Sequence, residues 1–300
     1  EYAGNGNGRR VWQKVKSELK IPYEAHLSSY SKHAYLLARE IAERATNEEH
    51  RVLLIVIGGD GTIHEVLNGC ANNKNIILGN IRAGSGNDFA RGFSAFNRVS
   101  DIEIFLQHPA VQTVDIGQMQ YASQELFINS CGMGFDAYVA IKTNDSKVKK
   151  WLNKCKLGKL GYVYYVVLGL FMFKPFSLMI KDGENILQYD QVWFATISNQ
   201  PYFGGGMKIS PTSVITDGKL ELTIVHNLSK HKFLTLFLTV FFGMHTRFKE
   251  VVQHSGEEFK IQFDRNVPCH ADGEKVDDLN LNLTVTVKQK ALEIAKNICE

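Results

Sequence analysis

The chain has 300 residues, of which 44% are hydrophobic and 22% charged, and its formal net charge is +3. This length exceeds that of a usual single domain, and the hydrophobic content is ample for two buried cores. The charge is too small to indicate a nucleic-acid-binding protein. The five cysteines are scattered and form no C-x-x-C pair, which excludes a disulfide framework and a zinc site and is typical of reduced thiols in a cytoplasm.

Helical and strand patterns alternate over the first hundred or so residues. The chain begins in a glycine-rich turn within residues 1–8, and we expect an opening strand before it. Residues 21–27 are strand-like, and apolar residues at helical spacing predict an amphipathic helix over residues 34–45. Such alternation predicts a doubly wound α/β domain over residues 1–110, with a parallel sheet between two helix layers.

The stretch V-L-L-I-V-I-G-G-D-G-T is the most informative feature of the chain. Residues 52–57 are apolar without alternation, which predicts a parallel strand covered on both faces. The turn of residues 58–62 follows, and Thr62 and Glu65 have the spacing of a capping box, which predicts a helix from about Thr62. Glycines at this turn let the backbone approach an anion at the positive end of a helix. Asp60 would repel phosphates there unless it acts through Mg²⁺, a bridging water or the hydroxyl that is phosphorylated.

A second turn of small residues strengthens this prediction. Residues 76–81 form another buried strand pattern, and A-G-S-G-N-D over residues 83–88 leads into a helix. A single such turn is typical of any β–α connection. Two of them from successive parallel strands meet at the carboxyl edge of the sheet, where open α/β sheets bind ligands.

From about Val111 the pattern changes to strands in close succession, which predicts an antiparallel β-sandwich or barrel-like second domain over residues 111–287. The predicted strands cover residues 111–119, 125–131, 176–181, 190–197, 219–225, 248–253, 259–263 and 281–287. A final helix is predicted over residues 289–298.

Four blocks together resemble the diacylglycerol kinase catalytic domain superfamily, in particular the soluble bacterial lipid kinases related to the diacylglycerol and sphingosine kinases. They are residues 58–69, 83–91, 199–225 and 272–274. G-G-D-G-T alone is shared with NAD kinases, but Y-F-G-G-G followed by Pro211 and Asp217-Gly218 is similar to the second domain of the lipid kinases. The resemblance also implies that the segment 288–300 returns to the first domain.

The resemblance implies an ATP-dependent kinase that transfers the γ-phosphoryl group to a lipid hydroxyl, with diacylglycerol giving phosphatidic acid as the first expectation. Two alternatives stay open. One is an NAD kinase-like enzyme acting on a small-molecule hydroxyl, and the other is a non-catalytic nucleotide or lipid sensor on the same fold.

The resemblance carries a set of ATP-binding residues to this chain. They are Gly4, Ser28, Gly58, Gly59, Asp60, Gly61, Thr62, Glu65, Ser85 and Asn87. Ser29 is a near rival of Ser28 for the hydroxyl after the second strand. Ordinary turn capping is the competing explanation for the serine hydroxyls.

Two carboxylates compete for the role of general base. The resemblance assigns proton abstraction to Glu274 of the D-G-E sequence, whereas the sphingosine kinase branch gives that role to the aspartate at Asp60. In a combined scheme, Glu274 deprotonates the lipid hydroxyl and Asp60 orients water around Mg²⁺. D-G-E by itself is more typical of a solvated hairpin turn.

A structural Mg²⁺ is implied at a loop of the second domain. Its ligands would be the carboxylate of Asp217 and the main-chain carbonyls of Val214 and Lys219, which are oxygen donors of the kind this ion prefers. By itself Asp217-Gly218 predicts a hairpin turn.

The membrane-facing part of the chain is predicted from residues 142–173. Seven lysines and one acid, with Trp151 among them, precede an aromatic-rich run over residues 162–173, and such a segment suits an anionic lipid surface. A solvated lysine face on a core helix is the alternative. Apolar runs fall short of the roughly 20 residues that a spanning helix needs, and no signal peptide is recognised. We therefore expect a cytoplasmic protein in transient peripheral contact with the inner face of the membrane, and a homodimer is left open.

Overall fold

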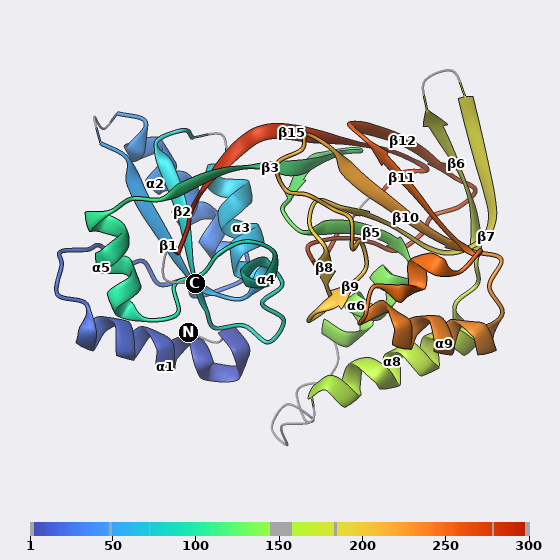
Figure 1. Ribbon diagram of the computed structural model, residues 1–300, viewed down its shortest axis with the longest axis horizontal. Helices are drawn as coiled ribbons and strands as arrows, with labels where there is room; N and C mark the ends of the chain where they lie inside the picture. Colours follow the sequence, from blue (N-terminus) through green and yellow to red (C-terminus); the bar gives the residue numbers. More distant parts are fainter. Residues whose placement is uncertain are drawn as a thin grey trace. The chain divides into compact units, whose positions relative to one another are not determined.

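The computed structural model describes residues 3–47, 50–71, 73–144, 158–182, 185–277 and 279–297. The chain forms two compact units. Unit 1 comprises Glu1–Ile116, Ile215–Gly218 and Lys288–Glu300, and unit 2 comprises Gly117–Val214 and Lys219–Val287. Two long strands, β3 (Val111–Gln120) and β15 (Asn282–Ala295), each run from one unit into the other (Figure 1).

Unit 1 is an α/β domain, as predicted. Its helices are α1 (Ala3–Glu18), α2 (His33–Ala45), α3 (Asp60–Cys70), α4 (Phe89–Gly92) and α5 (Val99–Gln107), and its strands include β1 (Val52–Gly58) and β2 (Ile76–Arg82). β1 and β2 pair in parallel with Val52 opposite Ile76, so the two strands end together at Gly58 and Arg82. The helical spacing predicted for α3 is confirmed, because its buried residues include Ile63, Val66, Leu67 and Cys70.

Unit 2 is a β-sandwich domain built from antiparallel pairs, also as predicted. Its strands besides β3 and β15 are β4 (Gln124–Phe127), β5 (Ser130–Gly134), β6 (Phe176–Asp182), β7 (Asn185–Ser198), β8 (Tyr202–Phe203), β9 (Met207–Lys208), β10 (Leu220–His226), β11 (Val251–Gly256), β12 (Glu258–Phe263), β13 (Cys269–Ala271) and β14 (Glu274–Lys275). The first part of β7 pairs with β6, and its end lies between β5 and β10. β7 therefore connects the β6 pairing to the β5 and β10 pairings within unit 2.

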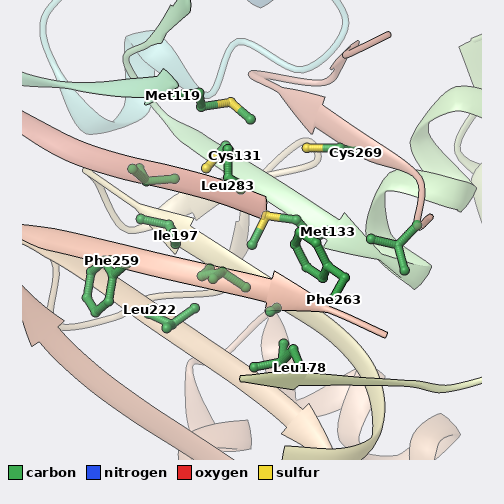
Figure 2. Close-up of a cluster of buried hydrophobic side chains, with 14 of the residues drawn as sticks. Met119, Cys131, Met133, Leu178, Ile197, Leu222, Phe259, Phe263, Cys269 and Leu283 are labelled. Carbon is green, nitrogen blue, oxygen red and sulfur yellow. The ribbon is translucent and has the colours of Figure 1, made fainter. Parts of the chain in front are cut away.

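Helices cover one side of unit 2. They are α6 (Phe135–Asn144), α8 (Gly158–Met172), α9 (Lys230–Val240) and the short 3₁₀ helix η1 (Met244–Arg247). α8 and α9 share a core cluster, to which Val166 and Leu170 contribute from α8 and Phe233 and Leu236 from α9. The other core lies between the strands and contains side chains from many of them, among them β3, β5, β7, β10 and β12 (Figure 2).

The predicted C-terminal helix is wrong, because the segment is a strand. β15 continues to Ala295 and pairs in parallel with β2, with Glu293 opposite Ile77 and Ile294 opposite Leu78. Leu292 and Ile294 are buried and Glu293 between them is half-buried, which is the alternation of a strand. The open edge of β2 supplies hydrogen-bond partners that outweigh a weak helix propensity.

The beginning of the chain also differs from the prediction. Residues 21–27 form no strand, and residues 3–8 belong to α1 rather than to a turn, although Gly6 has a φ of 94°. β1 is only partly buried, because a cavity of about 490 Å³ is lined by residues 52–57 on one side and residues 21–28 on another. Pro22, which has no N–H to donate, lies in the segment that does not pair.

Candidate functional site

Two glycine turns pack against each other at the carboxyl ends of β1 and β2. A Cβ atom on Gly59 would lie 2.9 Å from the Cα atom of Gly84, which is closer than real side chains approach a backbone. The N–H of Ala83 also donates to the carbonyl of Gly58 at 3.0 Å. The side-by-side placement predicted for the two turns is therefore confirmed, and it requires glycine on both sides.

The first of these turns opens directly into α3. The N–H of Ile63 donates to the carbonyl of Gly59 at 3.1 Å, so Gly61 and Thr62 occupy the first helical turn. Backbone N–H groups in that turn have no acceptor within the helix, and the helix dipole is positive there. The Thr62 side chain fills the space where Gly58 has none. A helix end of this kind can bind an anion.

Asp60 joins the two turns. One of its carboxylate oxygens, Oδ1, accepts a hydrogen bond from the N–H of Phe89 at 2.9 Å, at the start of α4. The other, Oδ2, lies so close to Gly86 that a side chain there would meet it at 2.7 Å. Asp60 is half-buried and belongs to the first turn of α3, so it contributes to the architecture of the site as well as its charge.

The second turn is closed by Asn87. Its side-chain amide accepts from the N–H of Gly84 at 3.0 Å and donates to the carbonyl of the same residue at 2.9 Å. Asn87 has a φ of 56°, which is a conformation that asparagine tolerates better than most residues. Ser85 is exposed at this turn. Asn87 thus shapes the turn, and Ser85 presents a hydroxyl on it.

Glu65 does not form the predicted capping box with Thr62. Its carboxylate accepts hydrogen bonds from the N–H groups of Lys32 and Ala34, at 2.8 and 3.1 Å, and so holds the N-terminus of α2 against α3. Lys32 has a φ of 67° there. The spacing of Thr62 and Glu65 predicted a cap within α3. The Glu65 carboxylate instead caps α2, which is distant in the sequence and so could not be recognised as its partner from the local pattern.

Ser28 lies on the same cavity as Thr62, the one of about 490 Å³ beside β1. It is half-buried, whereas Ser29 is exposed and donates its backbone N–H to the Nδ1 atom of His33. Gly4 lies in α1, whose Asn7 side chain donates to the carbonyl of Ala83 at 3.5 Å. The N-terminal segment therefore reaches the second glycine turn through Asn7, which the sequence did not single out.

In unit 2, D-G-E forms the hairpin between β13 and β14. Ala271 pairs with Glu274, and the two residues between them have positive φ values of 51° and 90°, as in a type I′ turn. The Asp272 carboxylate accepts hydrogen bonds from three consecutive N–H groups, those of residues 128–130, at 3.0, 2.7 and 3.2 Å. This anchor was missed in the sequence, whose D-G pair indicated only a turn. Glu274 is exposed at the first position of β14.

The loop that carries Asp217 is held by a carboxylate that the sequence did not reveal. Asp115 is 1% exposed, and its two oxygens accept from the N–H groups of Gly218 and Lys290, each at 2.7 Å. Asp217 itself is exposed. No group of three or more histidine, cysteine or carboxylate side chains placed to hold a metal occurs among the described residues. One carboxylate with main-chain carbonyls, the donor set predicted here, consists of oxygens that suit Mg²⁺.

Three cysteines, at positions 70, 131 and 269, are free thiols in the described part of the chain. Burial raises the pKa of the Cys70 thiol to about 12. Burial, with nearby carboxylates adding to it, also raises the pKa values of Cys131 and Cys269 well above the usual range. These thiols are neutral, so they carry no nucleophilic chemistry. Cys155 lies outside the described residues, as does most of the lysine-rich segment 142–159.

Family models match both halves of the chain. The model of the diacylglycerol kinase catalytic domain matches residues 1–119, and that of the YegS C-terminal NAD kinase beta sandwich-like domain matches residues 129–296. A crystal structure titled as a putative diacylglycerol kinase from Bacillus anthracis has the same fold, with a TM-score of 0.74 and 20% sequence identity over 99% of this chain and 93% of that one.

Two relatives from Bacillus subtilis cover most of the chain. A protein named "Putative lipid kinase YtlR" is 34% identical over 282 residues, which are 91% of this chain and 90% of the relative. A protein named "Diacylglycerol kinase" is 27% identical over 276 residues, which are 89% of this chain and 86% of the relative. The chain therefore belongs to the diacylglycerol kinase-like lipid kinase family, in which a diacylglycerol kinase catalytic domain is followed by a YegS C-terminal domain.

Proposed function

We propose that this protein is an ATP-dependent lipid kinase that transfers the γ-phosphoryl group of ATP to a lipid hydroxyl, with diacylglycerol as acceptor and phosphatidic acid as product. The observation that carries the proposal is the contact between the two glycine turns, which Gly59 and Gly84 permit because neither has a side chain, at the N-terminal end of α3, where a helix favours an anion such as phosphate. The names of the two Bacillus subtilis relatives support a lipid acceptor.

In this proposal the N-terminal end of α3 and the exposed hydroxyl of Ser85 bind the phosphates of ATP. Phosphoryl transfer depends mainly on positioning and on stabilising charge, so a rigid cradle of this kind supplies much of the catalysis. Mg²⁺ bound with ATP would neutralise phosphate charge, and Asp60 is the carboxylate placed to orient its water ligands. The hydrogen bond from Phe89 fixes the orientation of Asp60, which suits that role.

We propose Glu274 as the general base for the acceptor hydroxyl, with Asp60 as its competitor. Glu274 is exposed and follows a turn that Asp272 fixes through three hydrogen bonds. A base must be held in place and also remain accessible to the substrate, and Glu274 meets both requirements within unit 2. The loop with Asp217 is proposed to bind a second, structural Mg²⁺ through its carboxylate and the carbonyls of Val214 and Lys219.

Transient contact with an anionic bilayer is the remaining part of the proposal. α8 and α9 bury one face in a common core cluster, and Lys230 lies over the ring of Phe171, 5.4 Å from its centroid. The other faces of α8 and α9, and the turn that follows α9, expose large apolar side chains, among them Phe171, Met172, Leu234, Leu238, Phe241 and Phe242. We call these six residues the α8/α9 apolar surface.

The charges around the α8/α9 apolar surface favour a membrane over another protein. No acidic residue lies between Glu221 and Glu250 in the sequence. Glu250 is buried and pairs with Lys232 at 2.6 Å, and Lys230, Arg247 and Lys249 are exposed cations in the same stretch of the chain. Cations that flank an apolar helix face suit anionic headgroups. Among the described residues, no helix is long and apolar enough to cross a membrane.

The substrate is tested by incubating the protein with γ-labelled ATP and Mg²⁺ in separate reactions with diacylglycerol, monoacylglycerol, a sphingoid base, an isoprenoid alcohol and NAD. We expect label in the organic phase with diacylglycerol. Label in NAD would favour the NAD kinase-like alternative. ATP binding with no transfer to any acceptor would favour a sensor.

A further inference from the structure

A buried histidine contacts the hairpin that carries Glu274. His270 lies in β13, is 0% exposed, and its Nδ1 atom accepts a hydrogen bond from the N–H of Gly273 at 3.2 Å. Gly273 directly precedes Glu274 in the chain. The D-G-E turn is therefore held by Asp272 on one side and by His270 on the other.

The hydrogen bond from Gly273 determines the tautomer of His270. Because Nδ1 accepts the hydrogen bond from Gly273, the neutral ring carries its own hydrogen on Nε2. Nε2 points to Asp136, whose Oδ2 atom is 3.6 Å away. Oδ2 also accepts the hydroxyl of Thr196 at 2.7 Å, and Oδ1 accepts the N–H of Ala137 at 2.7 Å. A carboxylate accepts hydrogen bonds and donates none, so Asp136 favours the hydrogen on Nε2.

The ring is confined in its position. Phe203 stacks on the imidazole with ring centroids 4.7 Å apart and planes 5° from parallel. Gly132 lies against the gap between His270 and Asp136, where a Cβ atom would collide with both side chains. Glycine at position 132 therefore leaves the space in which the side chains of His270 and Asp136 face each other.

Simple core packing does not explain this arrangement. Nε2 of His270 is buried and finds no hydrogen-bond partner at normal distance among the residues that the structure describes. A buried donor in that state is unfavourable compared with an apolar side chain of the same shape. Such groups in native structures call for a reason beyond stability, and the contact of the same ring with the turn before Glu274 supplies one.

We propose that His270 is a positioning residue for Glu274, and that Asp136 fixes His270 in the tautomer that holds Gly273. This inference rests on the proposed role of Glu274 as the base. Asp136 and Thr196 act through His270 and do not themselves touch the reacting atoms in this scheme.

The test uses substitutions of Asp136 and His270, both in unit 2. In Asp136→Asn, the new amide N–H₂ can donate to Nε2, which moves the ring hydrogen to Nδ1 and opposes the N–H of Gly273. A displacement of about 1 Å at a reacting group can cost on the order of 100-fold in rate. We expect kcat on the lipid to fall by about 10- to 100-fold, with the Kd for ATP within about twofold of wild type. His270→Phe keeps the stacked ring without the acceptor and should show a similar fall.

The conservative variant His270→Asn provides the control. Its side-chain oxygen can replace Nδ1 as the acceptor for Gly273, so it should recover most of the turnover that His270→Phe loses. Adding Asp136→Asn to His270→Asn should then have little further effect, since no tautomer remains to be fixed. If Asp136→Asn and His270→Phe both turn over within about twofold of wild type, His270 is only a core residue and the inference fails.

A second measurement is independent of activity. The ¹⁵N chemical shifts of His270 in the folded wild-type protein report which nitrogen carries the hydrogen. We expect hydrogen on Nε2 in wild type and on Nδ1 in Asp136→Asn. Hydrogen on Nδ1 in wild type would overturn the inference even if the protein is a lipid kinase. Full activity of Glu274→Gln would instead reject the proposed base, and the tautomer shift would still show the coupling between Asp136 and His270.

Discussion

The carboxylate of Asp60 accepts a hydrogen bond from the N–H of Phe89, at 2.9 Å, and so links the turn after β1 to the helix after β2. This link gives Asp60 a structural role beside its proposed chemical one. The two roles can be separated, because asparagine keeps a side-chain oxygen that can accept from Phe89 but has no negative charge.

Asp60→Asn should therefore keep the fold and lose phosphoryl transfer. Asp60→Ala should lose transfer as well and also lower the free energy of unfolding by about 1 kcal/mol, the usual cost of removing an acceptor at a helix start. Thermal melting and turnover are to be measured on the same preparations. Most of the wild-type activity in Asp60→Asn would reject a role in metal or acceptor chemistry.

The contact between the glycine turns predicts that residue 59 tolerates no side chain, not even a methyl group. Gly59→Ala would place a Cβ atom 2.9 Å from the backbone of Gly84, so the two turns must separate. We expect the Kd for ATP, measured by calorimetry, to rise by at least about tenfold, which is about 1.4 kcal/mol.

Gly256→Ala is the matched control for Gly59→Ala. Its Cβ atom would meet the Phe259 ring at 3.4 Å and the Glu258 carbonyl oxygen at 3.8 Å, which are ordinary contacts, and its φ is not in the left-handed region. This variant should bind ATP like wild type. Unchanged ATP affinity in Gly59→Ala would show that the phosphates bind elsewhere.

Mg²⁺ is predicted to raise the free energy of unfolding by binding the loop around residue 217. This gain should depend on the carboxylate of Asp217 and not on that of Asp115. A metal that binds only the folded state adds about 2.7 kcal/mol at 100 times its Kd, and Asp217→Ala should remove this gain. Asp115→Ala should destabilise the protein at any Mg²⁺ concentration, by about 1–3 kcal/mol for each N–H left without an acceptor. Equal protection of wild type and Asp217→Ala by Mg²⁺ would mean that the loop is only a turn.

Glu274→Gln should keep the ATP affinity and lower kcat. A positioned general base contributes on the order of 10²–10⁴-fold to the rate. Phosphoryl transfer has a loose transition state that depends less on the base, so we expect a fall in kcat near the lower value. Nucleotide calorimetry and steady-state rates with a lipid acceptor check this. Wild-type turnover in Glu274→Gln together with an inactive Asp60→Asn would assign the base to Asp60.

The α8/α9 apolar surface is predicted to bind vesicles of equal parts phosphatidylglycerol and phosphatidylcholine. Leu238→Ser and Phe242→Ser each remove an exposed apolar side chain, worth about 1.5–3 kcal/mol when fully buried. We expect the double variant to reduce the bound fraction in a flotation assay by at least about tenfold. Binding should also weaken with salt, because the proposal places Lys230 and Arg247 against anionic headgroups.

Ile186→Ser serves as the control for the vesicle experiment. Ile186 is 68% exposed in β7, away from α8 and α9 in the chain, so its loss should leave vesicle binding unchanged. A double variant that floats like wild type would reject the α8/α9 apolar surface as the membrane contact. Concentration-dependent dimerisation that the double variant abolishes would instead assign the surface to a second copy of the chain.

The sequence by itself determined the features that are local in the chain. Six apolar residues before G-G-D-G-T specify the strand β1 and its turn into α3, although β1 is only partly buried, and the D-G pair before Glu274 specifies the two-residue hairpin. The resemblance in four blocks then indicated the family, because several short motifs in a fixed order are far more specific than any one of them.

Tertiary structure alone decided which distant groups meet. The segment ending at Ala295 is a strand because β2 offers an open edge, and Glu65 caps α2 because α2 and α3 pack together. Asp115 and Asp272 hold loops about 100 or more residues away in the chain. Bringing such distant residues together costs loop-closure entropy. The burial of both hydrophobic cores offsets that cost, so these hydrogen bonds form only when the whole chain has folded. No local pattern therefore marks the carboxylates that hold these loops.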